Sequence, residues 1–165
     1  MGIGYEYRCD CGESGMVTLG AGFGYPEVLE RAIEEIKAGK HGADLQEALL
    51  QNPSLKPDAQ SRIFICEDCG HWHVDIDMSL VEEIDHDSAS FDLDEALLDG
   101  TEVWDAWGTY MHLVKEQIPS CPKCKGNMHA IRVTEDDMPE RLPALTCPAC
   151  GKENVFGNGM AFDWD

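Results

Sequence analysis

The chain has 165 residues, with 12 Lys and Arg against 32 Asp and Glu, so its formal net charge at pH 7 is −20. A field of that sign repels phosphate backbones, which disfavours nucleic acid as a partner. No apolar run approaches the roughly 18 residues that a membrane span needs, and the first residues lack a charged-then-apolar signal pattern. We therefore expect a cytoplasmic protein with no membrane association, of one domain or two small ones.

The charge is distributed unevenly along the chain. Between Ile63 and Val114 there is no Lys or Arg, while acidic residues accumulate. The stretch 81–104 combines this high charge with few hydrophobic residues, which is typical of an acidic connector. The last third is more basic, and this leaves nucleic-acid binding by that part as an alternative through Lys123, Lys125, Arg132 and Arg141.

The first half of the chain alternates between strand and helix patterns. Tyr5–Arg8 predicts a strand, and Met16–Leu19 predicts its return strand. Pro26 suits the first turn of a helix, and apolar residues then recur at helical spacing until Gly39 ends it. A second helix is expected from Asp44 to Asn52. The sequence therefore predicts a two-helix insertion over residues 25–60.

The second half is richer in strand patterns. Strands are expected at Arg62–Cys66, at Trp72–Ile76 and over 128–133. The segment 103–118 fits a helix through Val103, Trp107, Tyr110 and Val114, but it also fits a strand that begins at Tyr110, so both remain open. The tail 157–165 is expected to pack only where Phe162 or Trp164 docks.

The chain contains 8 cysteines, and all of them fall into four close pairs. A Cys-x-x-Cys turn offers two thiolates from one loop, and two such turns complete a tetrahedral shell around a soft or borderline cation. A reducing cytoplasm favours metal over disulfides. Free buried cysteines or a thioredoxin-like redox pair are the alternatives, although no pair begins a clear helix within a βαβ unit. The candidate ligands are Cys9, Cys11, Cys66, Cys69, Cys121, Cys124, Cys147 and Cys150.

Cys121-Pro-Lys-Cys124 and Cys147-Pro-Ala-Cys150-Gly151 resemble the turns of the zinc-ribbon family and its rubredoxin-like members. The resemblance covers residues 118–156, and a looser version extends over 1–80. It implies an α+β fold with two small antiparallel zinc-ribbon sheets, the first of which carries the two-helix insertion. The implied domains are an N-terminal ribbon over 1–80, the acidic connector over 81–104 and a C-terminal ribbon over 105–165.

The cysteine pairs can be shared between two metal ions in more than one way. We expect two sequential sites, because a long loop between two half-sites adds little closure entropy. The first site then uses the two pairs before residue 80, and the second uses the two pairs after residue 120. The rival is a cross-brace, in which the first and third pairs share one ion and the second and fourth share the other. His71 or His73 could replace a cysteine ligand.

Two zinc ions in closed Cys₄ sites would be structural, because such a site has no open position for water or substrate. Four thiolates also suit iron, so rubredoxin-like electron transfer is an alternative, and zinc handling or sensing is another. We expect no enzyme activity. The resemblance implies an interaction or adaptor module with a protein partner that the sequence does not identify, and the sequence leaves the oligomeric state open.

Overall fold

A computed structural model describes residues 2–22, 24–83, 102–104, 110–132, 142, 145–153, 155–156 and 161–164. Its residues form two compact units, each assembled from separated stretches of chain. Unit 1 comprises Met1–Gly22, Ser61–Ile76 and Ile118–Asp165, whereas unit 2 comprises Phe23–Gln60 and Asp77–Gln117. None of the helices in the described residues combines the length and the apolar character that a membrane-spanning helix requires.

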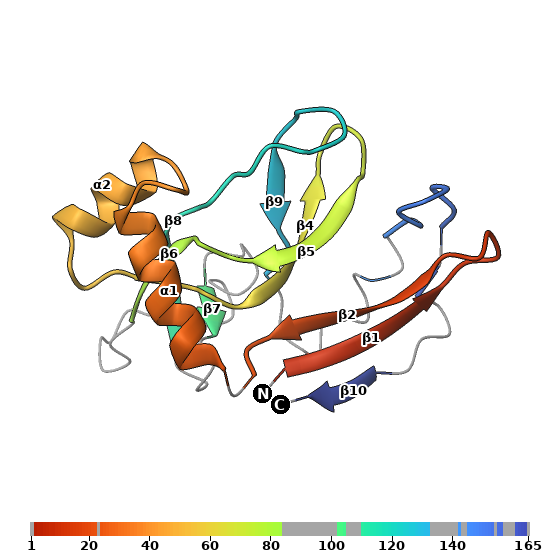
Figure 1. Ribbon diagram of the computed structural model, residues 1–165, viewed down its shortest axis with the longest axis horizontal. Helices are drawn as coiled ribbons and strands as arrows, with labels where there is room; N and C mark the ends of the chain where they lie inside the picture. The colour runs from red at the N-terminus through yellow and green to blue at the C-terminus, as the bar shows by residue number, and fades with distance from the viewer. Residues whose placement is uncertain are drawn as a thin grey trace. The chain divides into compact units, whose positions relative to one another are not determined.

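Unit 1 is built on one antiparallel sheet (Figure 1). The strand order is β10-β1-β2-β4-β5, and β9 pairs with β4 beside this path. Two hairpins form its framework: β1 pairs with β2 along its whole length, and β4 pairs with β5. The strands are β1 (Gly2–Arg8), β2 (Ser14–Gly20), β4 (Ser61–Cys66), β5 (Trp72–Ile76), β9 (Met128–Ala130) and β10 (Ala161–Trp164).

The core of unit 1 lies on one face of this sheet. Val17 and Leu19 of β2 are buried there in the period-2 pattern of a strand, and Ile63 of β4 joins them. The next residue of β4, Phe64, is buried in a separate small cluster. Residues from the last part of the chain complete the first of these clusters, and they include Leu145, Val155 and Phe156. The N-terminal hairpin and the C-terminal segment therefore share one core.

Unit 2 combines a second antiparallel sheet with two helices. The strand order is β3-β6-β8-β7, and Val81 of β6 and Met111 of β8 are buried against each other. The Tyr25 hydroxyl donates a hydrogen bond to the carbonyl oxygen of Asp58 at 3.1 Å. The elements are α1 (Tyr25–Lys37), α2 (Ala43–Gln51), β3 (Lys56–Pro57), β6 (Leu80–Glu83), β7 (Glu102–Trp104) and β8 (Tyr110–Lys115).

Helix α1 forms for the local reasons that the sequence indicated. Pro26 stands in its first turn, where a missing N–H leaves no hydrogen bond unmade, and Glu27 opposes the positive end of the helix dipole. Ala32 and Ile36 are fully buried on one face. Beyond the C-cap residue, Gly39 adopts φ 76°, the left-handed conformation that ends many helices.

The α+β class with two antiparallel sheets is confirmed, and the two predicted helices lie between β2 and β3. The sequence left helix and strand open for the segment 103–118. Within the described residues the strand is correct, since β8 covers Tyr110–Lys115. Most of the proposed connector over 81–104 lies outside the described residues, although β6 and β7 reach into its two ends.

The two units differ from the predicted division into successive ribbons over 1–80 and 105–165. Unit 1 contains residues from both ends of the chain and from its middle, because β10 pairs with β1 and β9 pairs with β4. All the cysteines belong to unit 1, and none belongs to unit 2. The two sheets therefore do not correspond to one metal site each.

Candidate metal centres

Four turns present the cysteines, and three of them directly adjoin a strand of unit 1. Cys9 and Cys11 lie in the turn between β1 and β2, and Cys66 ends β4 so that Cys69 lies in the β4–β5 turn. A third turn holds Cys121 and Cys124 before β9, and a fourth holds Cys147 and Cys150 after Leu145. The sheet thus fixes the position of three of the four pairs of sulfurs.

The four turns share one backbone pattern. In each, the N–H of the first cysteine donates to a carbonyl just past the turn, and the carbonyl of the first cysteine accepts a hydrogen bond from the residue after the second cysteine. The first set of bonds joins Cys9 to Glu13 (2.8 Å), Cys66 to His71 (2.8 Å), Cys121 to Gly126 (2.8 Å) and Cys147 to Lys152 (2.7 Å). The short Cys9-Asp10-Cys11 turn is therefore the same structure with one residue fewer.

The residue after the second cysteine has positive φ in every turn. Three of these positions are glycines, Gly12, Gly70 and Gly151, for which this conformation costs little. The fourth is Lys125 with φ 69°. Gly126, one residue later, lies against the carboxylate of the exposed Asp68 side chain, which would have to move if Gly126 carried a β-carbon.

The structure gathers the eight candidate ligands into two groups of four sulfurs, and within each group all the sulfurs lie within 4.8 Å of one another. The two groups are nested along the chain. We call the group formed by the first and fourth pairs the outer site and the group formed by the second and third pairs the inner site. The outer site is Cys9, Cys11, Cys147 and Cys150, and the inner site is Cys66, Cys69, Cys121 and Cys124.

Both pairings considered from the sequence are therefore wrong. Cys9 and Cys11 do not share a site with Cys66 and Cys69, as the sequential arrangement required, and the cross-brace is also not formed. Strand pairing is the physical reason. Cys66 of β4 lies opposite Met128 of β9, which brings the third turn to the second. The Arg8 amide donates to the carbonyl of Val155 at 3.0 Å, which brings the fourth turn to the first.

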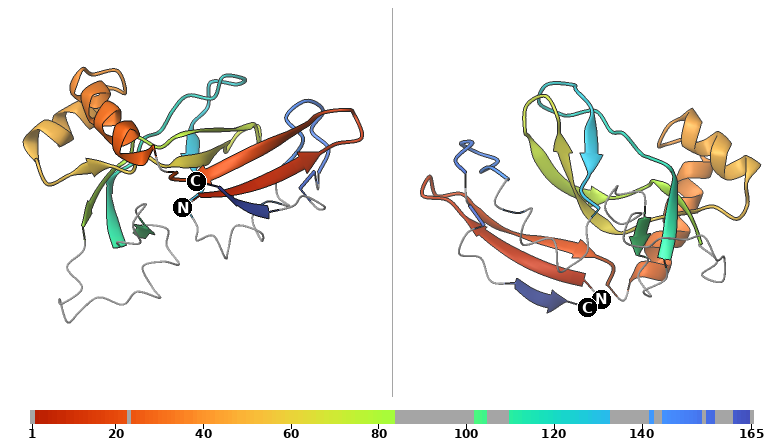
Figure 2. Two further views of the ribbon diagram at one scale, coloured as in Figure 1. Left: turned by 60° about the horizontal axis from the view of Figure 1, so that its bottom comes forward. Right: turned by 180° about the vertical axis from the view of Figure 1, so that it is seen from behind.

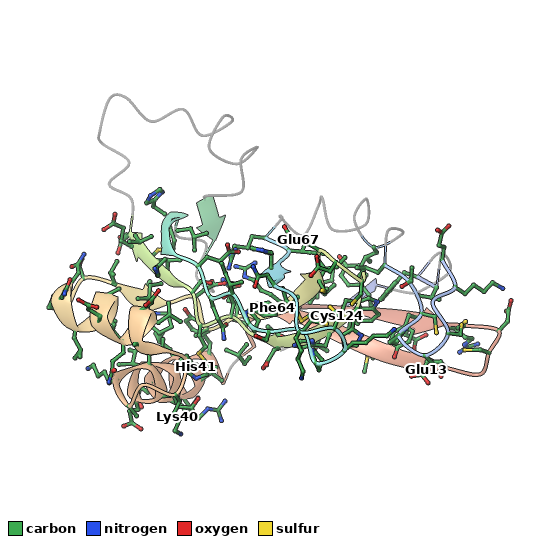
Figure 3. The ribbon with its side chains drawn as sticks, turned by 90° about the horizontal axis from the view of Figure 1, so that it is seen from above. Glu13, Lys40, His41, Phe64, Glu67 and Cys124 are labelled. Atoms are coloured by element: carbon green, nitrogen blue, oxygen red, sulfur yellow. The ribbon has the colours of Figure 1, made fainter. Side chains whose placement is uncertain are left out.

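The pictures show the same two associations. In Figure 1 and Figure 2 the blue segment near residue 150 lies beside the tip of the β1–β2 hairpin, and the cyan segment near residue 122 lies beside the tip of the β4–β5 hairpin. Figure 3 shows sulfur atoms gathered beside Cys124 and a second gathering near Glu13.

The sulfur–sulfur distances match the edges of a metal-centred tetrahedron. They are 3.5 Å for Cys9–Cys150, 3.7 Å for Cys11–Cys147, 3.4 Å for Cys66–Cys124 and 3.7 Å for Cys69–Cys121. A tetrahedron with Zn–S bonds of about 2.3 Å has edges of about 3.8 Å. A disulfide would need about 2.05 Å, and the cysteines are free thiols. The donor set and its geometry therefore fit a tetrahedral ion.

Burial divides each site in the same way. The first cysteine of every pair is buried and the second is exposed. Cys66 and Cys121 pack with Phe64 and Met128 in a small apolar cluster, whereas Cys9 and Cys147 belong to the main core of unit 1. In each site, two sulfurs therefore lie against apolar side chains and the other two lie at the surface.

The thiols of each group have opposed acidities. At the inner site, burial acts to raise the pKa of Cys121, but amide hydrogen bonds from Cys124 and Lys123 outweigh it and lower the pKa to about 6. The amide of Gly126 acts to lower the pKa of Cys124, but hydrogen bonds with neighbouring thiols raise it to about 12. Cys121 therefore ionises more easily than a free thiol and Cys124 less easily, because adjacent thiolates repel each other.

The outer site repeats this division. Burial opposes ionisation of Cys147, yet backbone amides lower its pKa to about 7. The Glu13 amide favours the thiolate of Cys11, but hydrogen bonds with neighbouring thiols raise its pKa to about 12. A divalent cation lets all four sulfurs of a group ionise together, since its charge offsets their repulsion.

An ion pair joins the two arms of the outer site, by which we mean the turn with Cys9 and Cys11 and the turn with Cys147 and Cys150. Lys152, after the fourth turn, contacts Asp10 in the first turn, and the hydrogen bond from Lys152 lowers the pKa of the Asp10 carboxyl. The same hydrogen bond raises the pKa of Lys152. Both side chains are exposed, so the pair contributes little to stability.

The histidines that could have replaced a cysteine lie outside both groups, which four sulfurs complete in each case. His73 stacks on Phe64, with ring centroids 6.1 Å apart. Sequence reasoning missed another residue, Trp72, whose indole N–H donates to the carbonyl of Thr146, next to Cys147, at 2.6 Å. Its place directly after the second turn was the available signal.

No protein-family model matches the chain, and comparisons with curated proteins and with solved structures give no significant match. What the protein can bind therefore has to be inferred from the geometry of the two cysteine groups. They make the protein a candidate for binding two metal ions.

Proposed function

We propose that this is a zinc-binding protein with two structural Cys₄ sites. The observation that carries the proposal is the presence of two closed groups of four sulfurs at tetrahedral spacing. Four protein thiolates fill the coordination shell of zinc, so no position remains for a substrate or an activated water. The role of each ion is then to hold together segments that are distant in sequence.

The span of the two sites supports a structural role. The outer site joins cysteines 136 to 141 residues apart, and the inner site joins cysteines 52 to 58 residues apart. Structural zinc in small domains contributes roughly 10 kcal/mol or more of apparent binding free energy at neutral pH. Ions at these positions would stabilise the association of both hairpins with the later turns.

Elemental analysis together with native mass measurement tests the metal proposal. We expect two zinc ions per chain and no visible absorption. A red protein with iron would instead favour the rubredoxin-like alternative, because iron in four thiolates absorbs visible light and transfers single electrons. A chain with oxidised cysteine pairs and no metal would contradict both.

We further propose that the metal-stabilised protein serves as an interaction or adaptor module. Its support is the resemblance of the cysteine turns to zinc ribbons and the net charge of −20, which favours a partner with a positively charged surface. Affinity purification with the zinc-loaded protein should retain a discrete partner whose binding weakens as salt rises. If retention equals that of a metal-free control, the adaptor role fails while the metal sites still stand.

A further inference from the structure

Trp72 contacts both arms of the outer site, although it belongs to the hairpin of the inner site. Its indole N–H donates to the Thr146 carbonyl at 2.6 Å, and Thr146 directly precedes Cys147. Its ring meets Tyr7 edge-on with centroids 5.7 Å apart, and Tyr7 lies two residues before Cys9. Trp72 therefore contacts the residues that lead into both halves of the outer site.

A third contact completes this arrangement. The ring of Phe156, which follows the fourth turn, lies 5.7 Å from Trp72 and 5.4 Å from Tyr7 between centroids. Trp72 is 5% exposed, so these contacts are enclosed in the core of unit 1. The three aromatic rings thus bring both arms of the outer site against the first residue of β5.

Trp72 belongs to the β4–β5 hairpin, whose turn carries two cysteines of the inner site. Trp72 is paired with Ile65 in the β4–β5 ladder and follows Cys69 by three residues. The turn between them is closed by the hydrogen bond from the Cys66 amide to the His71 carbonyl at 2.8 Å. An ion held by Cys66 and Cys69 would restrict this turn further, and with it the start of β5.

We infer that the two metal sites bind their ions cooperatively, with Trp72 as the positioning residue that couples them. This inference rests on the proposed function, since it requires both sites to hold metal. By linkage, an ion at either site must raise the affinity of the other by the same factor. Coupling between sites commonly amounts to a factor of about 5 to 150.

Loop lengths also indicate which site fills first. Closure of a loop becomes less favourable with the three-halves power of its length. The separations of 136 residues for Cys11–Cys147 and 52 for Cys69–Cys121 therefore favour the inner site by roughly four-fold. Cooperative loading then begins at the inner site and completes at the outer one.

Zinc titration of the metal-free full-length chain, followed by native mass spectrometry, is the first test. With a four-fold difference in affinity and no coupling, the one-zinc species reaches somewhat more than half of the chains at one equivalent. With five-fold coupling it falls to about a third. A one-zinc fraction equal to the one that independent sites would give, with the two affinities taken from the ligand-ablated chains described next, would overturn the inference while leaving the metal sites intact. Failure to bind zinc would overturn the proposed function.

Ligand-ablated chains give the second test. Cys121→Ser/Cys124→Ser removes the inner site and Cys147→Ser/Cys150→Ser removes the outer site. Each double substitution should lower the zinc affinity of the remaining site at least five-fold, and by equal factors. An affinity for the remaining site that is unchanged in both chains would overturn the coupling.

Trp72→Phe keeps an aromatic ring but removes the donor to Thr146. In the otherwise unmodified chain it should raise the one-zinc species at one equivalent toward the level expected for independent sites. Tyr25→Phe is the matched control, because it removes another buried hydrogen bond to a backbone carbonyl, in unit 2. If Trp72→Phe and Tyr25→Phe give the same one-zinc fraction as the parent, Trp72 does not couple the sites.

Discussion

Cys66, the last residue of β4, lies opposite Met128, the first residue of β9, in an antiparallel ladder. This pairing places the turn of Cys121 and Cys124 beside the turn of Cys66 and Cys69. The first and last cysteine pairs then form the other site, so the two sites are nested along the chain.

Metal removal should loosen unit 1 before unit 2, because all the proposed ligands belong to unit 1. After chelation we expect faster amide exchange in β1, β2, β4 and β5 than in the zinc-loaded protein, with a smaller change in α1 and α2. Hydrogen exchange with mass readout measures this directly. Uniform loss of protection across both units would contradict the assignment of the ions to unit 1.

Lys125→Gly should stabilise the zinc-loaded protein by about 1 kcal/mol, because a non-glycine residue at positive φ is disfavoured by about that amount. Lys125 has φ 69° and is exposed, so no packing is lost. Chemical denaturation measures the free energy of unfolding. Lys123→Gly is the control within the same turn; since Lys123 is not at positive φ, the added glycine should be neutral or destabilising.

Gly15→Ala should destabilise the protein by roughly 1 to 3 kcal/mol, the usual cost of overpacking. Gly15 pairs with Tyr7 across the β1–β2 hairpin, and a β-carbon there would lie 2.8 Å from Cε1 of the Tyr7 ring. In a Tyr7→Leu background the same substitution should cost less, which thermal denaturation of the four chains can determine. Equal costs in both backgrounds would show that the Tyr7 ring is not the obstacle.

Zinc affinity at both sites should fall as the pH is lowered from 8 to 6. Hydrogen bonds with neighbouring thiols, which outweigh the lowering effect of a backbone amide, raise the pKa of Cys124 and of Cys11 to about 12. These thiols must release protons when metal binds, so protons compete with the ion and the sign of the effect is fixed. Competition with a chelator of known pH dependence, at three pH values, measures it, and a constant affinity would contradict thiolate ligation.

The local structure of the metal turns could be predicted from the sequence, whereas the partner of each turn could not. Cys-x-x-Cys followed by Gly specifies a compact turn through its own hydrogen bonds and a left-handed residue, so the candidate ligands follow from residue type and spacing. Loop entropy distinguishes the possible pairings by only about 1 kcal/mol, because it grows slowly with length. The choice depends on the pairing of β4 with β9, two short strands separated by a long stretch of chain.

Two further features depend on tertiary contacts in the same way. Ala161–Trp164 forms β10 along β1, where only docking of Phe162 or Trp164 was expected from the sequence. Trp72 was predicted as an ordinary strand residue, and its link to Thr146 exists only because the fourth turn folds back onto the β4–β5 hairpin. Helices α1 and α2 were predicted closely, since their termini and apolar faces are encoded within a few residues of one another.

Cobalt loading of Cys11→Ser/Cys150→Ser distinguishes the nested arrangement of the two sites from the sequential one. Both substituted residues are exposed and belong to the outer site, so one complete tetrathiolate centre should remain, with about half the charge-transfer absorption of the parent. The matched variant Cys11→Ser/Cys69→Ser removes one ligand from each site and should leave no complete tetrathiolate centre. The reverse result, with the complete centre retained only in Cys11→Ser/Cys69→Ser, would contradict the nested sites and restore the sequential pairing.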